Sequence, residues 1–161
     1  MIWTLTIVKL PKMRKREIEE LMQRQILCRI AFRGKKHPYI APFQYVTMNG
    51  TLYFHFTNYG RKMNMLEVDN RVCVEIESYS SDLRKYRFVT LRGRLEVVND
   101  AGERTEAITK LMKEGEKKLS RNFLVAHGFS RSLNWSSMNP EKPLVIVKLA
   151  KIVERVGLKS A

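Results

Sequence analysis

The chain has 161 residues, of which 44% are hydrophobic and 29% are charged. This composition excludes a disordered chain, and the length supports one domain with its own core, which we expect to span residues 1–161. The formal net charge of +14 predicts attraction to anions, but the basic residues are scattered and no RNP-type motif, zinc finger or KH loop accompanies them, so we expect a basic surface without a nucleic-acid site.

The first eight residues are apolar, and their alternation predicts an added edge strand. They are too short to cross a bilayer and lack the basic region and cleavage site of a signal peptide, so we expect no membrane association. Cys28 and Cys73 lie in apolar runs, and no C-x-x-C or His/Cys cluster is present. This predicts buried free thiols, no metal site and a reducing, cytoplasmic setting.

The remaining pattern predicts an α+β protein. Helices are expected over residues 15–25, 61–68 and 100–119. Strands are expected over residues 27–33, 39–47, 51–57, 71–78, 86–98 and 144–156. Asn49-Gly50 predicts a hairpin turn, and residues 120–142 predict a helical piece followed by a loop. About six antiparallel strands with peripheral helices indicate a split β-barrel and exclude a doubly wound sheet.

In the strand over 39–47, Pro42 cannot donate a ladder hydrogen bond. It therefore predicts an edge, or a gap where a ligand replaces a neighbouring strand. In the strand over 51–57, a period of two places Tyr53, His55 and Thr57 on one face and Phe54 with Phe56 on the other. One face is expected to line the core of the barrel.

An anion site is predicted where this strand ends. Asn58 to Gly60 break the strand, and Arg61 and Lys62 then occupy the first turn of a short helix. Free backbone N–H groups and the helix dipole already make this turn positive, so each cation costs roughly 0.3–1 kcal/mol there. A phosphate would be stabilised by the same groups. Adjacent basic pairs such as Lys35-Lys36 occur elsewhere, so an ordinary solvated pair is the alternative.

Three pieces of the chain resemble the flavin-binding split barrel of the pyridoxamine 5′-phosphate oxidase-like superfamily. They are residues 38–45, 52–62 and 70–74, and the middle piece, Leu-Tyr-Phe-His-Phe-Thr-Asn-Tyr-Gly-Arg-Lys, is the most specific. Within this superfamily, the closer resemblance is to the nitroimidazole-reductase-like branch. It begins near Met13, so residues 1–12 are either an extension peculiar to this chain or sequence upstream of a later start codon.

The resemblance implies FMN as cofactor, with its phosphate held by Arg61 and Lys62 and its ring beside the two preceding strands. The implied cofactor-binding residues are Pro42, Phe43, Gln44, His55, Phe56, Thr57, Asn58, Arg61 and Lys62. It further implies an oxidoreductase that passes electrons from NAD(P)H to a small electron-poor acceptor. A homodimer is implied as well, and the aromatic residues Tyr39, Phe43, Tyr45 and Tyr53 suggest a partner surface.

Two departures restrict the substrate. Vitamin B6 oxidases carry an additional Arg and Lys on the strand that reads Ala41 to Val46 here, and their C-terminal substrate signature contains Arg and His. This chain has no Arg or Lys between Tyr39 and Thr47, and its C-terminus lacks that signature. Oxidation of pyridoxamine phosphate is therefore not expected.

Other functions stay open at this stage. A flavin, deazaflavin or haem carrier without turnover, or a basic nucleic-acid binder, could use the same barrel. His127 is the candidate haem ligand, although a histidine beside a glycine is also typical of a helix end. His55 is the candidate catalytic residue, with a pKa near neutral pH expected if it donates a proton, and packing against a neighbouring strand is its alternative role.

Overall fold

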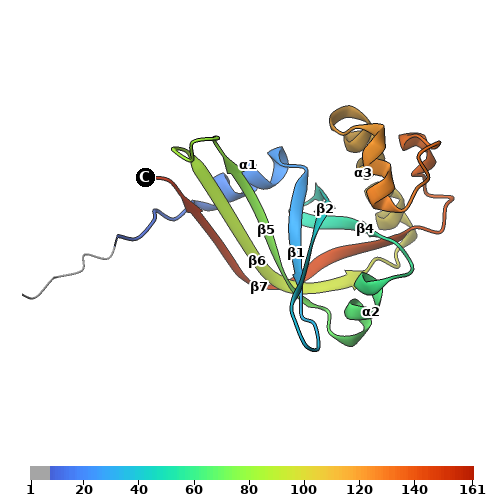
Figure 1. The fold of residues 1–161 in the computed structure, drawn as a ribbon, viewed down its shortest axis with the longest axis horizontal. Helices are drawn as coiled ribbons and strands as arrows, with labels where there is room; N and C mark the ends of the chain where they lie inside the picture. The colour runs from blue at the N-terminus through green and yellow to red at the C-terminus, as the bar shows by residue number, and fades with distance from the viewer. Residues whose placement is uncertain (1–7) are drawn as a thin grey trace, which may run out of the picture.

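One antiparallel sheet of seven strands forms the body of the protein in the computed structural model, which describes residues 8–161 (Figure 1). The strands are β1 (Leu27–Phe32), β2 (Tyr39–Gln44), β3 (Val46–Met48), β4 (Thr51–Phe56), β5 (Arg71–Tyr79), β6 (Tyr86–Val97) and β7 (Val145–Lys159). The helices are α1 (Lys15–Arg24), α2 (Arg61–Val68) and α3 (Ala101–Lys118), followed by the short 3₁₀ helices η1 (Arg121–His127) and η2 (Trp135–Ser137). The expected α+β barrel is confirmed. The edge strand predicted at the N-terminus falls outside the described residues, except for Val8.

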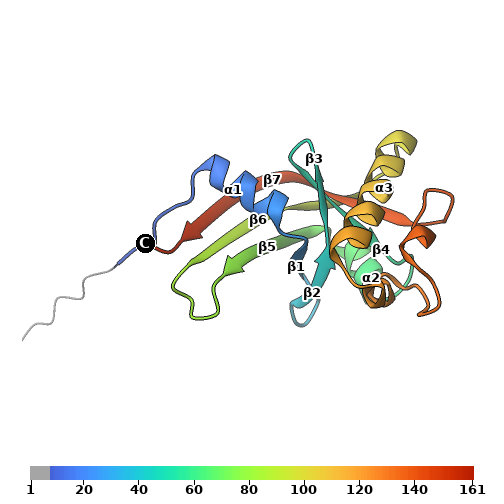
Figure 2. The same cartoon turned by 90° about the horizontal axis from the view of Figure 1, so that it is seen from above.

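The sheet curls because one segment supplies both of its edges. The strand order is β2-β1-β5-β6-β7-β4-β3, yet β2 and β3 are consecutive in the chain and only Tyr45 separates them. The single strand predicted over 39–47 is therefore wrong. Tyr45 bends the chain there, donating its backbone N–H to the Ile26 carbonyl (3.1 Å) and its hydroxyl to the Met22 carbonyl (2.6 Å). The turn carries the chain across the open side of the sheet (Figure 2).

β4 is buried on both faces. Phe54 and Phe56 point into the barrel, where Phe56 stacks on Phe43 of β2 with ring centroids 4.9 Å apart. Tyr53 points the other way, into a second cluster beneath α3 that includes Ile108 and Leu111. The predicted alternation along this strand is confirmed.

The predicted partner surface of aromatic residues is not found in the barrel. Phe43, Tyr45 and Tyr53 are only 6%, 2% and 6% exposed, because the chain's own core covers them. Tyr39 is half-buried and packs against Phe32 at a centroid distance of 5.9 Å. The aromatic residues therefore give no reason to expect a dimer.

The second cluster is closed by Trp135 of η2, which lies against Gly115 of α3. A methyl group at Gly115 would come within 2.3–2.5 Å of the indole ring, so this position requires a glycine. Residues 121–138 are thereby held over the outer face of β4. η1 is part of this covering segment and brings His127, which is 7% exposed, beneath it.

We predict that Gly115→Ala destabilises the protein. Alanine favours a helix by about 1 kcal/mol, but overpacking against Trp135 costs about 1–3 kcal/mol, so the net effect is a loss. The matched control is Gly102→Ala in the same helix, where the nearest atom to the new methyl group lies at 3.4 Å. Urea unfolding is expected to show a lower free energy for Gly115→Ala and an unchanged or higher one for Gly102→Ala. Equal stabilisation by both substitutions would contradict the tight contact.

Candidate functional site

The chain turns sharply between β4 and α2. Gly60 adopts a φ of 95°, a left-handed conformation that favours glycine, and Arg61 and Lys62 follow as the first two residues of α2. No side chain caps this helix and its first turn contains no acidic residue. Among the described residues, neither cation forms an ion pair with a carboxylate. The helix start thus combines free amide groups with two uncompensated positive charges.

Both cations lie over aromatic rings of β2. The Arg61 guanidinium is 5.4 Å from the centroid of Tyr39, and the Lys62 ammonium is 4.6 Å from that of Phe43. These cation–π contacts fix the direction of each side chain without neutralising its charge. Burial lowers the pKa of Lys62. The arrangement therefore positions two charges for an anion and leaves them available to it.

Most of the predicted site residues meet around one small hollow of about 20 Å³. From the predicted set, the lining residues are Pro42, Phe43, Gln44, His55, Phe56, Thr57 and Lys62. Asn58 and Arg61 do not line it and are exposed at the surface. A volume of this size holds about one water molecule, so it is too small for a flavin ring.

η1 closes this hollow with three residues that sequence reasoning did not assign to the site. They are Phe123, Ala126 and His127. The apolar residues in 120–129 predicted a helical piece but gave no indication of what it covers. The position of η1 depends on packing against β4 and α3, which the local sequence does not encode.

A buried chain of polar groups runs through the wall of the hollow. Gln44 donates its Nε2 to the backbone carbonyl of Leu111 (2.9 Å), and its Oε1 lies 2.7 Å from Nε2 of His127. Nδ1 of His127 lies 3.0 Å from Nδ1 of His55. Gln44, His55 and His127 are 2%, 6% and 7% exposed. Both polar atoms of the Gln44 side chain are therefore engaged inside the protein.

The two histidines are held in the neutral form. Burial lowers the pKa of His55 to about 4, and the Lys62 ammonium contributes to the shift. Burial lowers the pKa of His127 to about 3, with smaller contributions from His55 and Lys62. The expectation of a pKa near neutral pH for His55 is therefore wrong, because it took no account of this burial.

Other roles for these histidines are limited by the same contacts. Both ring nitrogens of His127 are engaged in hydrogen bonds, so in this arrangement neither is free to ligate a haem iron. Cys28 and Cys73 are free thiols; Cys28 is buried as expected, whereas Cys73 is only half-buried. Within residues 8–161, no group of three or more His, Cys, Asp or Glu side chains is placed to hold a metal ion. No helix in the same residues is long and apolar enough to cross a membrane.

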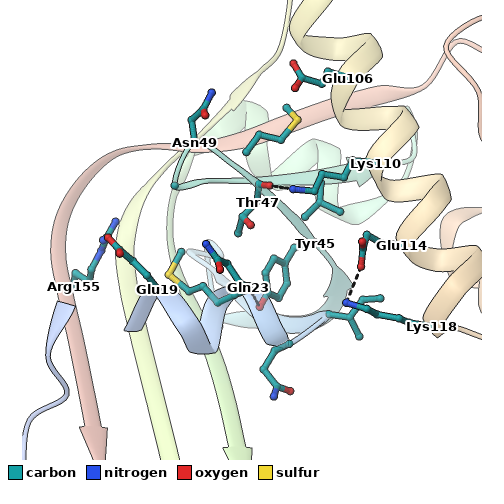
Figure 3. A pocket seen from close by; sticks show the side chains of 16 residues that line it. Glu19, Gln23, Tyr45, Thr47, Asn49, Glu106, Lys110, Glu114, Lys118 and Arg155 are labelled. Carbon is teal, nitrogen blue, oxygen red and sulfur yellow. Dashed lines mark hydrogen bonds and ion pairs between the residues drawn. The ribbon is translucent and has the colours of Figure 1, made fainter. Parts of the chain in front are cut away.

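A second hollow, of about 650 Å³, lies between α1, α3 and the turn that joins β3 to β4 (Figure 3). Glu114 and Lys118 on its α3 wall form an ion pair of 2.7 Å, and Lys110 donates to the Thr47 carbonyl. Glu19 and Arg155 lie at the opposite end. None of the predicted site residues lines this hollow, so it is separate from the site at α2.

Comparison with known proteins identifies relatives over most of the chain. Residues 14–127 match the model of the family described as pyridoxamine 5′-phosphate oxidase. The match therefore runs from the residue before α1 to the last residue of η1. A search of curated protein sequences finds no match.

Several solved structures share the fold. An FAD-binding protein from Mesorhizobium loti superposes with a TM-score of 0.69 at 17% identity, covering 96% of this chain and 100% of that one. A candidate 5-nitroimidazole antibiotic resistance protein from Bacteroides thetaiotaomicron gives 0.65 at 18% identity, with coverages of 98% and 96%. An FAD and haem binding protein from Mycobacterium smegmatis gives 0.65 at 15%, with coverages of 91% and 71%. At these identities the structures establish the fold alone.

We predict that acidification destabilises the protein through its two buried histidines. An unfolded histidine takes up a proton near pH 6.5, whereas the folded values are about 4 for His55 and about 3 for His127. Between about pH 6.5 and pH 4 the unfolded state therefore binds more protons, and the free energy of unfolding falls as the pH falls. The loss between pH 7 and pH 5 is about 2 kcal/mol for each histidine.

Urea unfolding at the two pH values measures this slope. The double variant His55→Phe/His127→Phe is expected to remove most of it, whereas the control His37→Gln, in the exposed loop between β1 and β2, should keep it. An unchanged slope in the double variant would show that other groups cause the pH dependence.

Proposed function

The chain belongs to the pyridoxamine 5′-phosphate oxidase family, and from that premise we propose that it is an FMN-dependent oxidoreductase. Arg61 and Lys62 hold the phosphate of FMN at the start of α2, and the flavin ring lies beside β2 and β4. Electrons come from NAD(P)H and pass to a small electron-poor acceptor. The observation that carries this proposal is the pair of uncompensated cations at a helix start.

The phosphate end of FMN fits the residues present. A phosphate group accepts hydrogen bonds from free amides and from both cations, which removes the unfavourable interaction of these cations with the helix dipole. Lys62 is half-buried, so its interaction with an anion is screened less than at an open surface. The cation–π contacts reduce the freedom that the two side chains would lose on binding.

The isoalloxazine ring of FMN is too large for the interior of the hollow and would lie outside it, beside β2. β2 is an edge strand, so one side of its backbone has no neighbouring strand, as Pro42 led us to expect. Free backbone N–H and C=O groups there suit the polar rim of an isoalloxazine ring. When bound, the flavin supplies the two-electron chemistry that the side chains lack. The residues of β2 and β4 orient it and exclude water from one side.

Membership of this family does not imply that pyridoxamine phosphate is the substrate. No Arg or Lys stands between Tyr39 and Thr47, so β2 and β3 offer no second site for the phosphate of a pyridoxamine substrate. His55 is neutral at physiological pH, and a neutral imidazole contributes no positive charge toward an anionic substrate. These features favour a small uncharged acceptor, such as a nitroaromatic compound.

We predict that the double variant Arg61→Ala/Lys62→Ala binds FMN at least tenfold more weakly than the wild type. Each charge-assisted hydrogen bond to phosphate contributes about 1.5–3 kcal/mol. The loss of two such bonds therefore weakens binding more than tenfold, even if hydrogen bonds from water to the phosphate recover part of the lost free energy. Equilibrium dialysis measures the affinity. Mass spectrometry of the chromophore released from the purified protein distinguishes FMN from a deazaflavin.

The matched control is Lys35→Ala/Lys36→Ala, which removes the same charge from the exposed loop between β1 and β2. It is expected to leave FMN affinity within about twofold. Equal weakening by both double variants would mean that the overall charge of the chain attracts the cofactor and that α2 holds no phosphate site.

We further propose a homodimer with two flavin sites at the subunit interface. The apolar residues Ile40, Tyr59 and Val68 are 61%, 66% and 62% exposed; Ile40 and Tyr59 lie close in sequence to proposed flavin contacts, and Val68 ends the helix that begins at Arg61. A partner subunit would cover these side chains and the open side of the flavin.

Light scattering is expected to give twice the chain mass of 18.9 kDa when FMN is bound. The variant Ile40→Asp/Val68→Asp, which places charges on the proposed interface, should shift the mass toward the monomer. A monomeric wild type with FMN fully bound would contradict this arrangement.

A further inference from the structure

The polar chain through the wall of the hollow fixes the position of each proton in it. The carbonyl of Leu111 can only accept a hydrogen bond, so the Gln44 atom 2.9 Å from it is the amide nitrogen. The Gln44 atom facing His127 is then the amide oxygen, which also can only accept. Nε2 of His127, 2.7 Å away, therefore carries a proton.

The assignment continues to the second histidine. Since His127 is neutral and protonated at Nε2, its Nδ1 is a bare acceptor. Nδ1 of His55 lies 3.0 Å from it and must donate, so His55 is protonated at Nδ1. Nε2 of His55 is then without a proton, and it has no hydrogen-bond partner among the described residues.

We propose that His127 is a positioning residue which, together with Gln44, holds His55 as its Nδ1–H tautomer, so that Nε2 of His55 serves as a hydrogen-bond acceptor for the ligand. The Lys62 ammonium lines the same hollow and is the group proposed above to hold the phosphate of FMN. The fixed protons give the wall of the hollow one hydrogen-bond acceptor. The tautomer is a property of the protein alone, whereas the ligand's identity rests on the proposed function.

This acceptor defines the class of ligand that the site takes. A ligand must present an N–H or O–H group to His55, and because the hollow has only about 20 Å³, the rest of the ligand lies outside it. Protonation of His55 would destroy the acceptor, and the folded protein resists this because the imidazole is 6% exposed and lies near an ammonium group. His55 is therefore an acceptor of hydrogen bonds and not an acid.

The direct test is nitrogen-15 NMR of the imidazole rings in the full chain at pH 7, without added ligand. We expect His55 to be protonated at Nδ1 and bare at Nε2, and His127 to show the opposite pattern. The exposed His37 provides an internal reference in the same spectrum. A His55 ring that carries its proton on Nε2 would overturn the proposal.

Variants of His127 then separate positioning from packing. His127→Asn keeps an acceptor where Nδ1 stands and should preserve the His55 tautomer, whereas His127→Leu removes it and should give mixed tautomers. If His127→Leu fails to fold, Gln44→Met removes the oxygen that holds the His127 proton and should also release the His55 tautomer. An unchanged His55 tautomer in folded His127→Leu, or in folded Gln44→Met, would show that His127 does not position it.

The functional consequence is measured with FMN-loaded protein, NADH and a nitroaromatic acceptor that bears an N–H group. KM for the acceptor is expected to rise at least fivefold in His127→Leu and to recover in His127→Asn, with equal FMN content. An equal rise in both variants would overturn the positioning role. A wild type that shows the predicted tautomers but binds no FMN would instead overturn the proposed function and leave the proton assignment standing.

Discussion

The turn at Tyr45 is the constraint on which the rest of the structure depends. Its two hydrogen bonds, to the carbonyls of Ile26 and Met22, fix the point where the chain leaves one edge of the sheet and becomes the other. A flat sheet could not satisfy this connection, so the sheet curls. Phe43 and Gln44, the two residues before the turn, then point in opposite directions, one into the barrel and one toward η1.

The side chains of β4 alternate between two faces, one apolar and one that carries polar groups. Its Phe residues complete the barrel core, while Tyr53 faces α3 and His55 faces the segment that follows α3. A buried polar side chain is costly unless it is hydrogen-bonded, and His55 is stable there because His127 is its partner. The covering segment therefore serves the site as well as the core. Without it, His55 would meet solvent and lose its fixed orientation.

Much of this arrangement could be predicted from the sequence because it depends on short-range rules. Period-2 burial along β4, the edge position of β2 marked by Pro42, and the helix beginning at Arg61 all follow from local pattern. The break at Tyr45 could not be predicted, since an aromatic residue in a strand-like run carries no turn signal. The contact of His127 with Gln44 spans 83 residues and its contact with His55 spans 72, so neither has a local signature. The lowered pKa values follow from this long-range burial and could not be predicted either.

The pairing of β4 with β7 has a consequence for the growing chain on the ribosome. Phe56 at the end of β4 pairs with Val145 at the start of β7, which is synthesised 89 residues later. At roughly 5–20 residues per second, β4 waits about 4–18 s for its partner. During this interval the run Thr-Leu-Tyr-Phe-His-Phe, buried on both faces in the final fold, is exposed as an apolar strand edge without charged residues. The strand edge of β4 is therefore left unpaired, and open to association with other chains, until translation reaches β7.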